Sequence, residues 1–220
     1  TEAVVGATST TVTGLIADTY YDAYVQADCG FSGISAFSSV AYLYTGYCIP
    51  SSANTPIYIN NLTTTSVGTN ISNTGSGFSA GGYGDFRAQA ITGLYGSQSF
   101  DVAFVNDGQY GGKMYAWVDW NNDLAFDNTA GSSEIVFVLD DANYGSGTFT
   151  VTIPDGQAVG DFVLRIKVEQ VSNPSGPCGD MVYGEVEDYT ISVSEACSWN
   201  GATSTDWATG SNWSTGVAPT

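Results

Sequence analysis

Apolar and polar residues alternate along much of this chain in short runs, and turns rich in glycine, asparagine, aspartate and proline separate the runs. Alternation of this kind is typical of strands with one buried face, because successive side chains of a strand point to opposite sides. Residues that favour helices, such as lysine, arginine, glutamate and leucine, are scarce. The pattern predicts an all-β fold, a sandwich or a barrel. The clearest strand-like runs are Tyr20–Ala27, Ser99–Val105, Met114–Trp120, Glu134–Leu139, Thr148–Ile153, Asp161–Glu169 and Tyr189–Val193.

The positively charged residues divide the chain into three parts. All four of them lie between positions 87 and 167, and residues 1–45 and 195–220 contain none. This shift in composition predicts a central domain with different material on each side. The four residues are Arg87, Lys113, Arg165 and Lys167.

The first part, residues 1–45, has a strand pattern of its own, with strands expected at Thr11–Leu15, Tyr20–Ala27 and Ser35–Thr45. It resembles the C-terminal half of a fibronectin type III domain in the region of the leucine and the tyrosine corner. Half a sandwich exposes an apolar face, so strands of a longer protein or of another chain are expected to complete it. The residues that carry the resemblance are Leu15, Thr19, Tyr21, Val25, Ala27 and Ser35–Ser38.

The centre of the chain contains a signature. Residues 184–189 are Gly-Glu-Val-Glu-Asp-Tyr, and the strand-like residues 190–193 follow. They resemble the signature of the GEVED domain, a module of large secreted multidomain proteins, mostly from Bacteroidetes-type bacteria. The resemblance covers 46–194 and implies a secreted, jelly-roll-like β-sandwich without known catalysis of its own. Further matching segments are Tyr47–Cys48, Tyr58–Asn61, Gly82–Phe86, Trp117–Asp123, Phe126–Asp127, Phe149–Pro154, Arg165–Lys167 and Pro177–Gly179.

The tail, residues 195–220, has tryptophans among small and polar residues, in Cys197–Gly201, Asp206–Trp207 and Asn212–Trp213. It is similar to an opening segment that introduces repetitive β regions in the same kinds of surface protein. Trp199, Trp207 and Trp213 therefore form either the core of a further β-rich region, which is favoured, or exposed platforms for sugar rings. Trp117 stands in an alternating run, and core packing is expected there.

The charge balance excludes several functions. The chain has 22 acidic residues, four basic residues and no histidine, for a formal net charge of −18. A chain this acidic repels phosphate backbones and anionic lipids, so neither nucleic acid nor a membrane is an expected partner. Without histidine there is no Ser-His or Cys-His nucleophile pair and no imidazole ligand for zinc. No apolar run approaches the ~18 residues that a membrane-spanning helix needs.

An acidic loop begins at Asp119. Oxygen-bearing side chains follow at alternate positions, with a backbone carbonyl at the seventh, and this is the ligand order of a calcium loop. Leu124 replaces the usual glycine at the sixth position and Ala130 the usual glutamate at the twelfth, which excludes a complete helix-loop-helix site. The alternative is an acidic turn whose side chains bond their own backbone. The candidate ligands are Asp119, Asn121, Asp123, Ala125 and Asp127.

The GEVED resemblance offers further carboxylates for a calcium site, namely Glu134 and the cluster Glu185, Glu187 and Asp188. In a strand, Glu185 and Glu187 share one face and Asp188 points to the other. Two like charges on one face need a cation or solvent, and the nearest positive candidates are the two basic residues of the run 161–169. Paired carboxylates also carry out glycoside hydrolysis, but structural pairing or calcium ligation is the favoured interpretation.

Four cysteines, at positions 29, 48, 178 and 197, lie in a chain without Cys-x-x-Cys spacing. Structural disulfides of an exported protein are therefore expected, rather than a metal or redox motif. Cys48 opens the central domain and Cys178 precedes its last strand, so a bridge between them would tie the ends of one fold together. Cys29 and Cys48 are expected a strand length apart, too far for a disulfide. Partners outside this sequence are expected for Cys29 and Cys197.

These features favour a non-catalytic structural or adhesive module of a large secreted or cell-surface protein, with calcium as a cofactor that stiffens one loop. Two alternatives stay open. One is a carbohydrate-binding accessory domain of a secreted enzyme, and the other is a subunit of an extracellular filament assembled by strand addition. Expected partners are other domains of the same polypeptide, cell-surface glycans or proteins, and further copies of the chain. The expected location is extracellular or on a bacterial cell surface, and no enzyme activity is expected.

Overall fold

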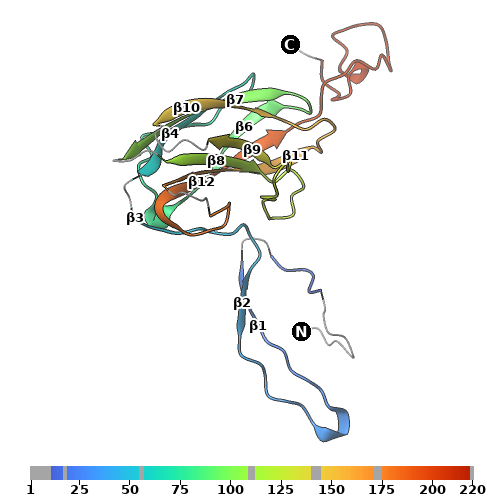
Figure 1. Cartoon of the computed structure of the whole chain (residues 1–220). Coiled ribbons are helices and arrows are strands. Elements are labelled where there is room, and N and C mark those ends of the chain that lie inside the picture. Colours follow the sequence, from blue (N-terminus) through green and yellow to red (C-terminus); the bar gives the residue numbers. More distant parts are fainter. Residues whose placement is uncertain are drawn as a thin grey trace. The chain divides into compact units, whose positions relative to one another are not determined.

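A computed structural model describes residues 11–16, 19–54, 57–108, 112–139, 145–170 and 175–218. The chain divides into two compact units, Thr1–Cys48 and Ile49–Thr220. Its regular structure is almost entirely β, as the alternation predicts (Figure 1). In the described part of the chain, no helix is long and apolar enough to cross a membrane.

The described part of the first unit is a two-stranded antiparallel ribbon. β1 (Tyr20–Ala23) pairs with β2 (Ala41–Tyr44). Residues beyond the strands continue the pairing as far as a bridge between Asp28 and Ile34, and a 3₁₀ turn at Gly30–Ser32 closes the tip. The ribbon presents its two strands to solvent without a covering layer of its own.

The ribbon is shorter than the sequence predicts, and no strand forms at 11–16. The hydroxyls of Ser38 and Ser35 accept hydrogen bonds from the amides of Val25 and Ala27, at 3.0 and 2.9 Å. Side-chain acceptors of this kind compete with a strand ladder, so regular pairing ends early. The fibronectin type III resemblance remains a prediction.

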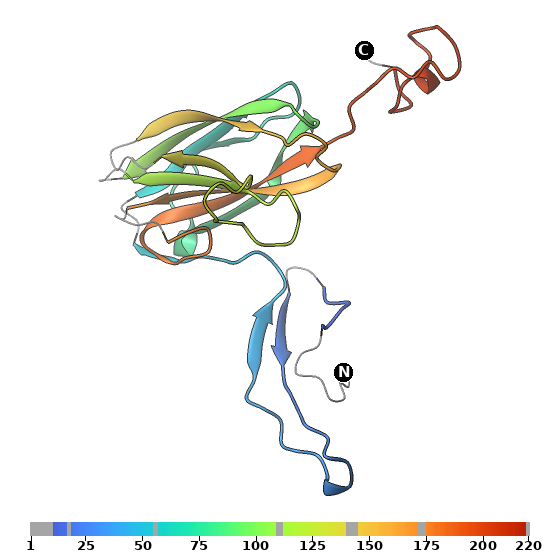
Figure 2. The ribbon, with the colours of Figure 1, turned by 45° about the vertical axis from the view of Figure 1, so that its right-hand side comes forward.

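The second unit contains two sheets that face each other (Figures 1 and 2). The smaller sheet has the strand order β10-β7-β4-β5, and all of its neighbouring strands are antiparallel. Its strands are β4 (Ile57–Thr65), β5 (Ser72–Thr74), β7 (Ser99–Gly108) and β10 (Ser146–Thr152).

The larger sheet has the order β3-β12-β11-β8-β9, and β6 pairs in parallel with β12. β12 is its central strand, because β11 pairs along one side of it and both β3 and β6 pair along the other. The strands are β3 (Ser52–Asn54), β6 (Tyr83–Leu94), β8 (Lys113–Val118), β9 (Ile135–Leu139), β11 (Gly160–Glu169) and β12 (Met181–Val193), with 3₁₀ turns at Ala80–Gly82 and Gly210–Asn212.

The core lies between the two sheets and consists mainly of alternate side chains from the longer strands of both sheets. Leu164, Ile166 and Val168 of β11 are fully buried there. Phe137 of β9 stacks on Phe149 of β10, with ring centroids 4.2 Å apart. Each such buried side chain contributes roughly 1.5–3 kcal/mol of hydrophobic stabilisation, so these contacts hold the two sheets face to face.

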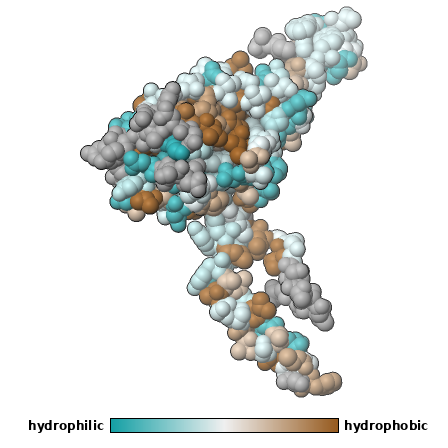
Figure 3. All heavy atoms as spheres, viewed as in Figure 1, coloured by the Kyte–Doolittle hydropathy of each residue, from teal (hydrophilic) through white to brown (hydrophobic). Residues whose placement is uncertain are grey.

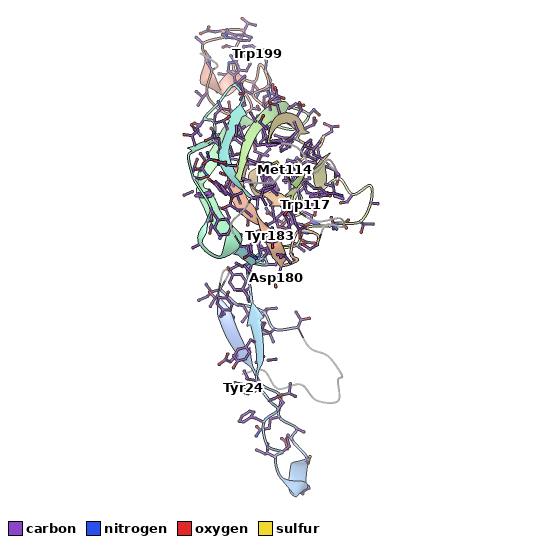
Figure 4. The ribbon with its side chains drawn as sticks, turned by 60° about the vertical axis from the view of Figure 1, so that its left-hand side comes forward. Tyr24, Met114, Trp117, Asp180, Tyr183 and Trp199 are labelled. Atoms are coloured by element: carbon purple, nitrogen blue, oxygen red, sulfur yellow. The ribbon has the colours of Figure 1, made fainter. Side chains whose placement is uncertain are left out.

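The outer face of the larger sheet is buried as well, because loops cover it. Trp117 of β8 is 1% exposed on this face, and its indole N–H donates to the side-chain oxygen of Asn128 in the loop before β9, at 3.1 Å. Met114, on the same strand, belongs to the core (Figure 4). Trp117 is thus buried as predicted, but under a loop rather than between the sheets.

β9 is an edge strand of the larger sheet, and β8 is its one partner among the strands that the structure describes. An apolar patch reaches the surface of the second unit in this region (Figure 3), where Val138 is 54% exposed. Val138 pairs with Tyr115 on the outer face of the sheet, so this exposed apolar side chain belongs to the outer face of the edge and not to the core.

The strand-like runs predicted from alternation all overlap observed strands. The prediction missed β3, β4, β5 and β6. β4 contains the polar pair Asn60 and Asn61 at a bulge, and β6 has Arg87 and Gln89 on a strand that pairs along only part of its length. Such strands lack clean alternation, so their partners rather than their own sequence define them.

Candidate functional site

The signature residues 184–189 lie on β12, at the centre of the larger sheet. Glu185 and Glu187 point to the core side, where they meet groups of the smaller sheet, and Asp188 points to the outer face. All three acidic side chains are 0% exposed. The two faces therefore hold two separate buried acidic clusters, as strand alternation requires.

On the outer face, Asp188 forms a buried ion pair with Arg165 of β11. The guanidinium donates from Nε and Nη2 to the two carboxylate oxygens at 2.8 and 2.7 Å, a bidentate arrangement. The Tyr83 hydroxyl donates to the same carboxylate at 2.8 Å, and the guanidinium carbon lies 4.6 Å from the centre of the Phe126 ring. Burial raises the pKa of Tyr83 and the Asp188 charge raises it further, so this hydroxyl stays a donor.

Next to this pair, Lys167 fastens the loop that precedes β12. Its ammonium donates to the Ser175 hydroxyl at 2.6 Å and to the carbonyls of Gly176 and Gly179, each at 2.9 Å. Glu169 lies 3.2 Å from the same nitrogen. Burial lowers the pKa of Lys167, and the nearby Glu169 carboxylate opposes that shift.

The same loop contains Cys178, which is disulfide-bonded, as is Cys48. The predicted bridge between these two cysteines is confirmed. Arg165 also donates to the carbonyl of Pro177, at 3.1 Å, so the loop is held by a covalent bond and by two cations. Cys29 and Cys197 are free and exposed.

On the core side, Glu185 connects the two sheets. Its carboxylate accepts a hydrogen bond from the amide of Ile59 in β4 at 2.8 Å and another from the amide of Ser79 at 2.6 Å. Burial raises the pKa of Glu185, while both amide hydrogen bonds act in the opposite direction. Each carboxylate oxygen therefore satisfies a backbone donor of another element.

Glu187 lies beside it in a less polar environment. One of its oxygens accepts a hydrogen bond from the Tyr189 hydroxyl at 2.7 Å, and the side-chain amide of Asn73 in β5 donates to that hydroxyl, also at 2.7 Å. The other oxygen has no hydrogen-bond partner among the described residues. Burial raises the pKa of Glu187 to about 8, the bond from Tyr189 opposes the rise, and the Glu185 charge adds to it. At neutral pH this carboxyl is therefore mostly protonated.

The acidic loop between β8 and β9 is anchored by two buried carboxylates. Asp119 is 0% exposed and accepts hydrogen bonds from the amides of Asp123 and Leu124, at 3.3 and 3.0 Å. Glu134 is 5% exposed and accepts one from the amide of Asp127 at 2.6 Å. Burial raises the pKa of Glu134, and the charges of Asp119, Asp123 and Asp127 raise it further. The three aspartates thus lie close enough to Glu134 for their charges to act on it.

Other side chains of the loop bond their own backbone two residues further on. The side-chain oxygens of Asn121, Asp123 and Asp127 accept hydrogen bonds from the amides of Asp123, Ala125 and Thr129, each at 2.9 Å. These turns match the alternative that the sequence leaves open beside calcium ligation. Hydrogen bonds from Thr129 lower the pKa of Asp127. Within the described ranges, no group of three or more acidic or cysteine side chains is arranged to hold a metal ion.

The candidate ligands of the sequence therefore fall into three places. The loop residues from Asp119 to Glu134 lie together, Asp188 lies against Arg165, and Glu185 and Glu187 occupy the opposite face of β12. The hydroxyl and amide partners of the carboxylates do not follow from the sequence. Tyr83 lies in a segment of the GEVED resemblance, which could have indicated it as a site residue. Nothing in the sequence indicates Asn73 on the short strand β5.

The buried positions limit the chemistry of the acidic pair on β12. Glu185 and Glu187 are both fully buried, and they accept hydrogen bonds from groups of the protein itself. General acid and base catalysis needs a carboxyl within hydrogen-bond reach of a substrate. The arrangement instead joins sheets and loops to one another.

Two comparisons with known proteins bear on this arrangement. No curated protein matches the chain. Residues 113–192 match the family model of the GEVED domain. The match runs from the start of β8 into the end of β12, so it includes the acidic loop, Arg165 and the signature. This segment is therefore similar to a GEVED domain, which is a non-catalytic type of module.

Proposed function

We propose that this chain is a non-catalytic structural or adhesive module of a larger secreted or cell-surface protein. The burial of the signature carries the proposal, since Glu185 and Asp188 bond groups of other strands and loops, and Glu187 bonds Tyr189 of its own strand. Carboxylates placed in this way support the fold and are not themselves at the surface. The disulfide supports an extracytoplasmic location, because such bonds persist in oxidising compartments.

A combined measurement of activity and stability tests the structural role. The chain should not hydrolyse chromogenic glycosides or peptides, and Glu187→Gln should change its stability alone. Turnover that disappears in a folded Glu187→Gln variant would contradict the proposal, because it would give the buried pair a catalytic role.

The proposal includes calcium binding at the acidic loop. Asp119, Asp123, Asp127 and Glu134 supply the hard oxygen atoms that calcium prefers. Burial raises the pKa of Glu134, and the charges of the nearby aspartates raise it further; a bound cation would offset these charges. To bind it, the exposed carboxylates of Asp123 and Asp127 would turn from their own backbone amides toward the two buried ones.

Thermal unfolding with and without calcium tests this part of the proposal. With an affinity typical of extracellular modules, about 10 mM calcium raises Tm by roughly 3–10 °C, because the ion binds the folded state alone. Asp123→Asn should reduce the shift, and Asp206→Asn in the tail should leave it unchanged. An identical Tm in calcium and in chelator would refute the calcium site without affecting the structural role.

A second function, assembly into a filament, is favoured by the ribbon of the first unit. Its Tyr20, Val25 and Tyr42 are 71%, 73% and 77% exposed. A two-stranded ribbon is marginally stable in water, so a strand added from another chain would stabilise it and cover these side chains. Sedimentation velocity should then show growth with protein concentration, and Tyr42→Lys should suppress it. A constant monomer mass over the whole range would exclude assembly.

A further inference from the structure

Two exposed tryptophans lie together in the tail of the chain. Trp199 and Trp207 are 41% and 61% exposed, and their rings are stacked, with an interplanar angle of 12° and centroids 5.9 Å apart. Trp213 is 6% exposed and meets both rings edge-on, with centroids 5.1 and 4.2 Å away. Figure 4 shows Trp199 at this end of the chain. The exposed pair therefore rests on a buried third ring.

A buried asparagine holds the cluster in place. The side-chain oxygen of Asn212, which is 0% exposed, accepts hydrogen bonds from the amides of Thr203 and Ser204, each at 2.8 Å. Its amide group donates to a hydroxyl and a carbonyl of the same loop, each at 2.9 Å. The Trp213 indole donates to the carbonyl of Trp207 at 2.9 Å. The platform is thus organised before any ligand arrives, which reduces the entropic cost of binding.

The surroundings of the rings define the chemistry of a ligand. Asn200 and Asp206, next in sequence to the two exposed tryptophans, are themselves exposed and carry hydrogen-bonding groups. Residues 195–220 contain no lysine or arginine, so an anionic ligand would find no positive partner there. In Figure 3 the surface of the tail is mostly intermediate to hydrophilic. A ligand with a flat apolar face and hydroxyl groups at its rim suits this surface.

We propose that Trp199 and Trp207 form a platform that binds the ring face of neutral sugar residues in an oligosaccharide. At up to about 250 Å² for a whole tryptophan, the exposed fractions of the two rings amount to roughly 250 Å². A standard protein interface needs about 800 Å² on each side, far more than this. Within the described part of the tail, Val217 is the one other large apolar side chain that is exposed. The size of the surface therefore favours a sugar over a protein partner.

The platform goes beyond the proposed function and does not rest on it, since the acidic loop and the β12 signature take no part. Isothermal titration of the whole chain with cellohexaose, chitohexaose, xylohexaose and mannohexaose tests it. At least one of these should bind, and Trp207→Ala should weaken that binding by roughly three- to tenfold, the worth of one stacked aromatic contact. Trp207→Phe should lose less, because it keeps a ring.

Tyr95→Ala is the matched control, because Tyr95 is 40% exposed, like Trp199, but belongs to the turn between β6 and β7. It should bind the hexasaccharide as the unchanged chain does. The Trp213 indole N–H resonance in a proton NMR spectrum checks that each tail variant keeps its fold. If Trp207→Ala loses the fold of the tail, the binding of Trp207→Phe tests the proposal instead. Binding of none of the four hexasaccharides overturns the proposal, and so does equal loss in Tyr95→Ala.

Discussion

The two faces of β12 both bury carboxyl groups, but they stabilise them in different ways. On the outer face, the carboxylate of Asp188 is buried against a guanidinium that binds both of its oxygens. On the core face, Glu185 and Glu187 are equally buried, but they accept hydrogen bonds from backbone amides and a tyrosine hydroxyl. One signature of six residues therefore contains an acid neutralised by an ion pair and an acid neutralised by a proton.

The difference shows what decides the state of a buried carboxyl. Desolvation disfavours the charged form at both positions, and a nearby positive charge can repay that cost. Arg165 and Lys167 both point to the outer face, because they occupy alternate positions of β11. The core face receives no cation, and the pKa of Glu187 rises to about 8 as a result of burial. Strand alternation thus gives the two faces opposite pH behaviour.

The largest effect is expected from breaking the ion pair. Arg165→Met leaves Asp188 buried without a cation and should lower the free energy of unfolding by about 3–5 kcal/mol. The double variant Arg165→Met/Asp188→Leu should recover most of this loss, since no uncompensated charge remains. Urea unfolding followed by tryptophan fluorescence measures both.

The matched control for this prediction is the pair Arg87–Asp85 on β6, which has the same chemistry but is partly exposed. Arg87→Ala should cost at most about 1 kcal/mol, because water screens the charges. If Arg165→Met lowered the free energy of unfolding no more than Arg87→Ala does, the buried pair Arg165–Asp188 would contribute no more to stability than the partly exposed one.

A smaller effect is expected from the disulfide that anchors the loop over the outer face. The double variant Cys48→Ser/Cys178→Ser should lose about 2–4 kcal/mol, because the bridge restricts the unfolded chain. Cys29→Ser, at a free and exposed cysteine, should unfold like the unchanged chain. A non-reducing peptide map that joined Cys48 to any other cysteine would contradict the bridge itself.

The smallest effect, per pH unit, is expected from the pH dependence of stability that Glu187 on the core face causes. The pKa of Glu187 is about 8 in the folded protein against an ordinary value of 4.5, so the folded state holds the proton more tightly than the unfolded chain. Its contribution to stability is fully present below pH 4.5 and is lost as the pH rises through 8. Between these values the loss approaches about 1.4 kcal/mol per pH unit.

Glu187→Gln removes the titrating group and should flatten this part of the stability profile. Glu195→Gln, at an exposed glutamate, should leave the profile as it is. Chemical unfolding at half-unit steps from pH 5 to 9 compares the three proteins. A slope that persists in Glu187→Gln would assign the pH dependence to another group.

Particular residues show how much of the site can be predicted from the sequence. Alternation alone separated Glu185 and Glu187 from Asp188 and put the basic residues of β11 on one face, and the structure agrees. The acidic loop was recognised from its spacing, yet its turn bonds and the burial of Asp119 and Glu134 depend on packing against the sheet. The strand expected at 11–15 does not form, because a short apolar run needs a partner strand to become one.

The sequence by itself determined the all-β class, the main strands and the face on which each signature residue lies, because side-chain direction in a strand follows position alone. The tertiary structure decided which of those faces are buried. Loops held by Lys167, Phe126 and the Cys48–Cys178 bridge cover the outer face, while β4 and β5 cover the other. Only this burial separates a paired carboxylate from a protonated one, since desolvation and the nearest charge are properties of the assembled fold rather than of neighbouring residues.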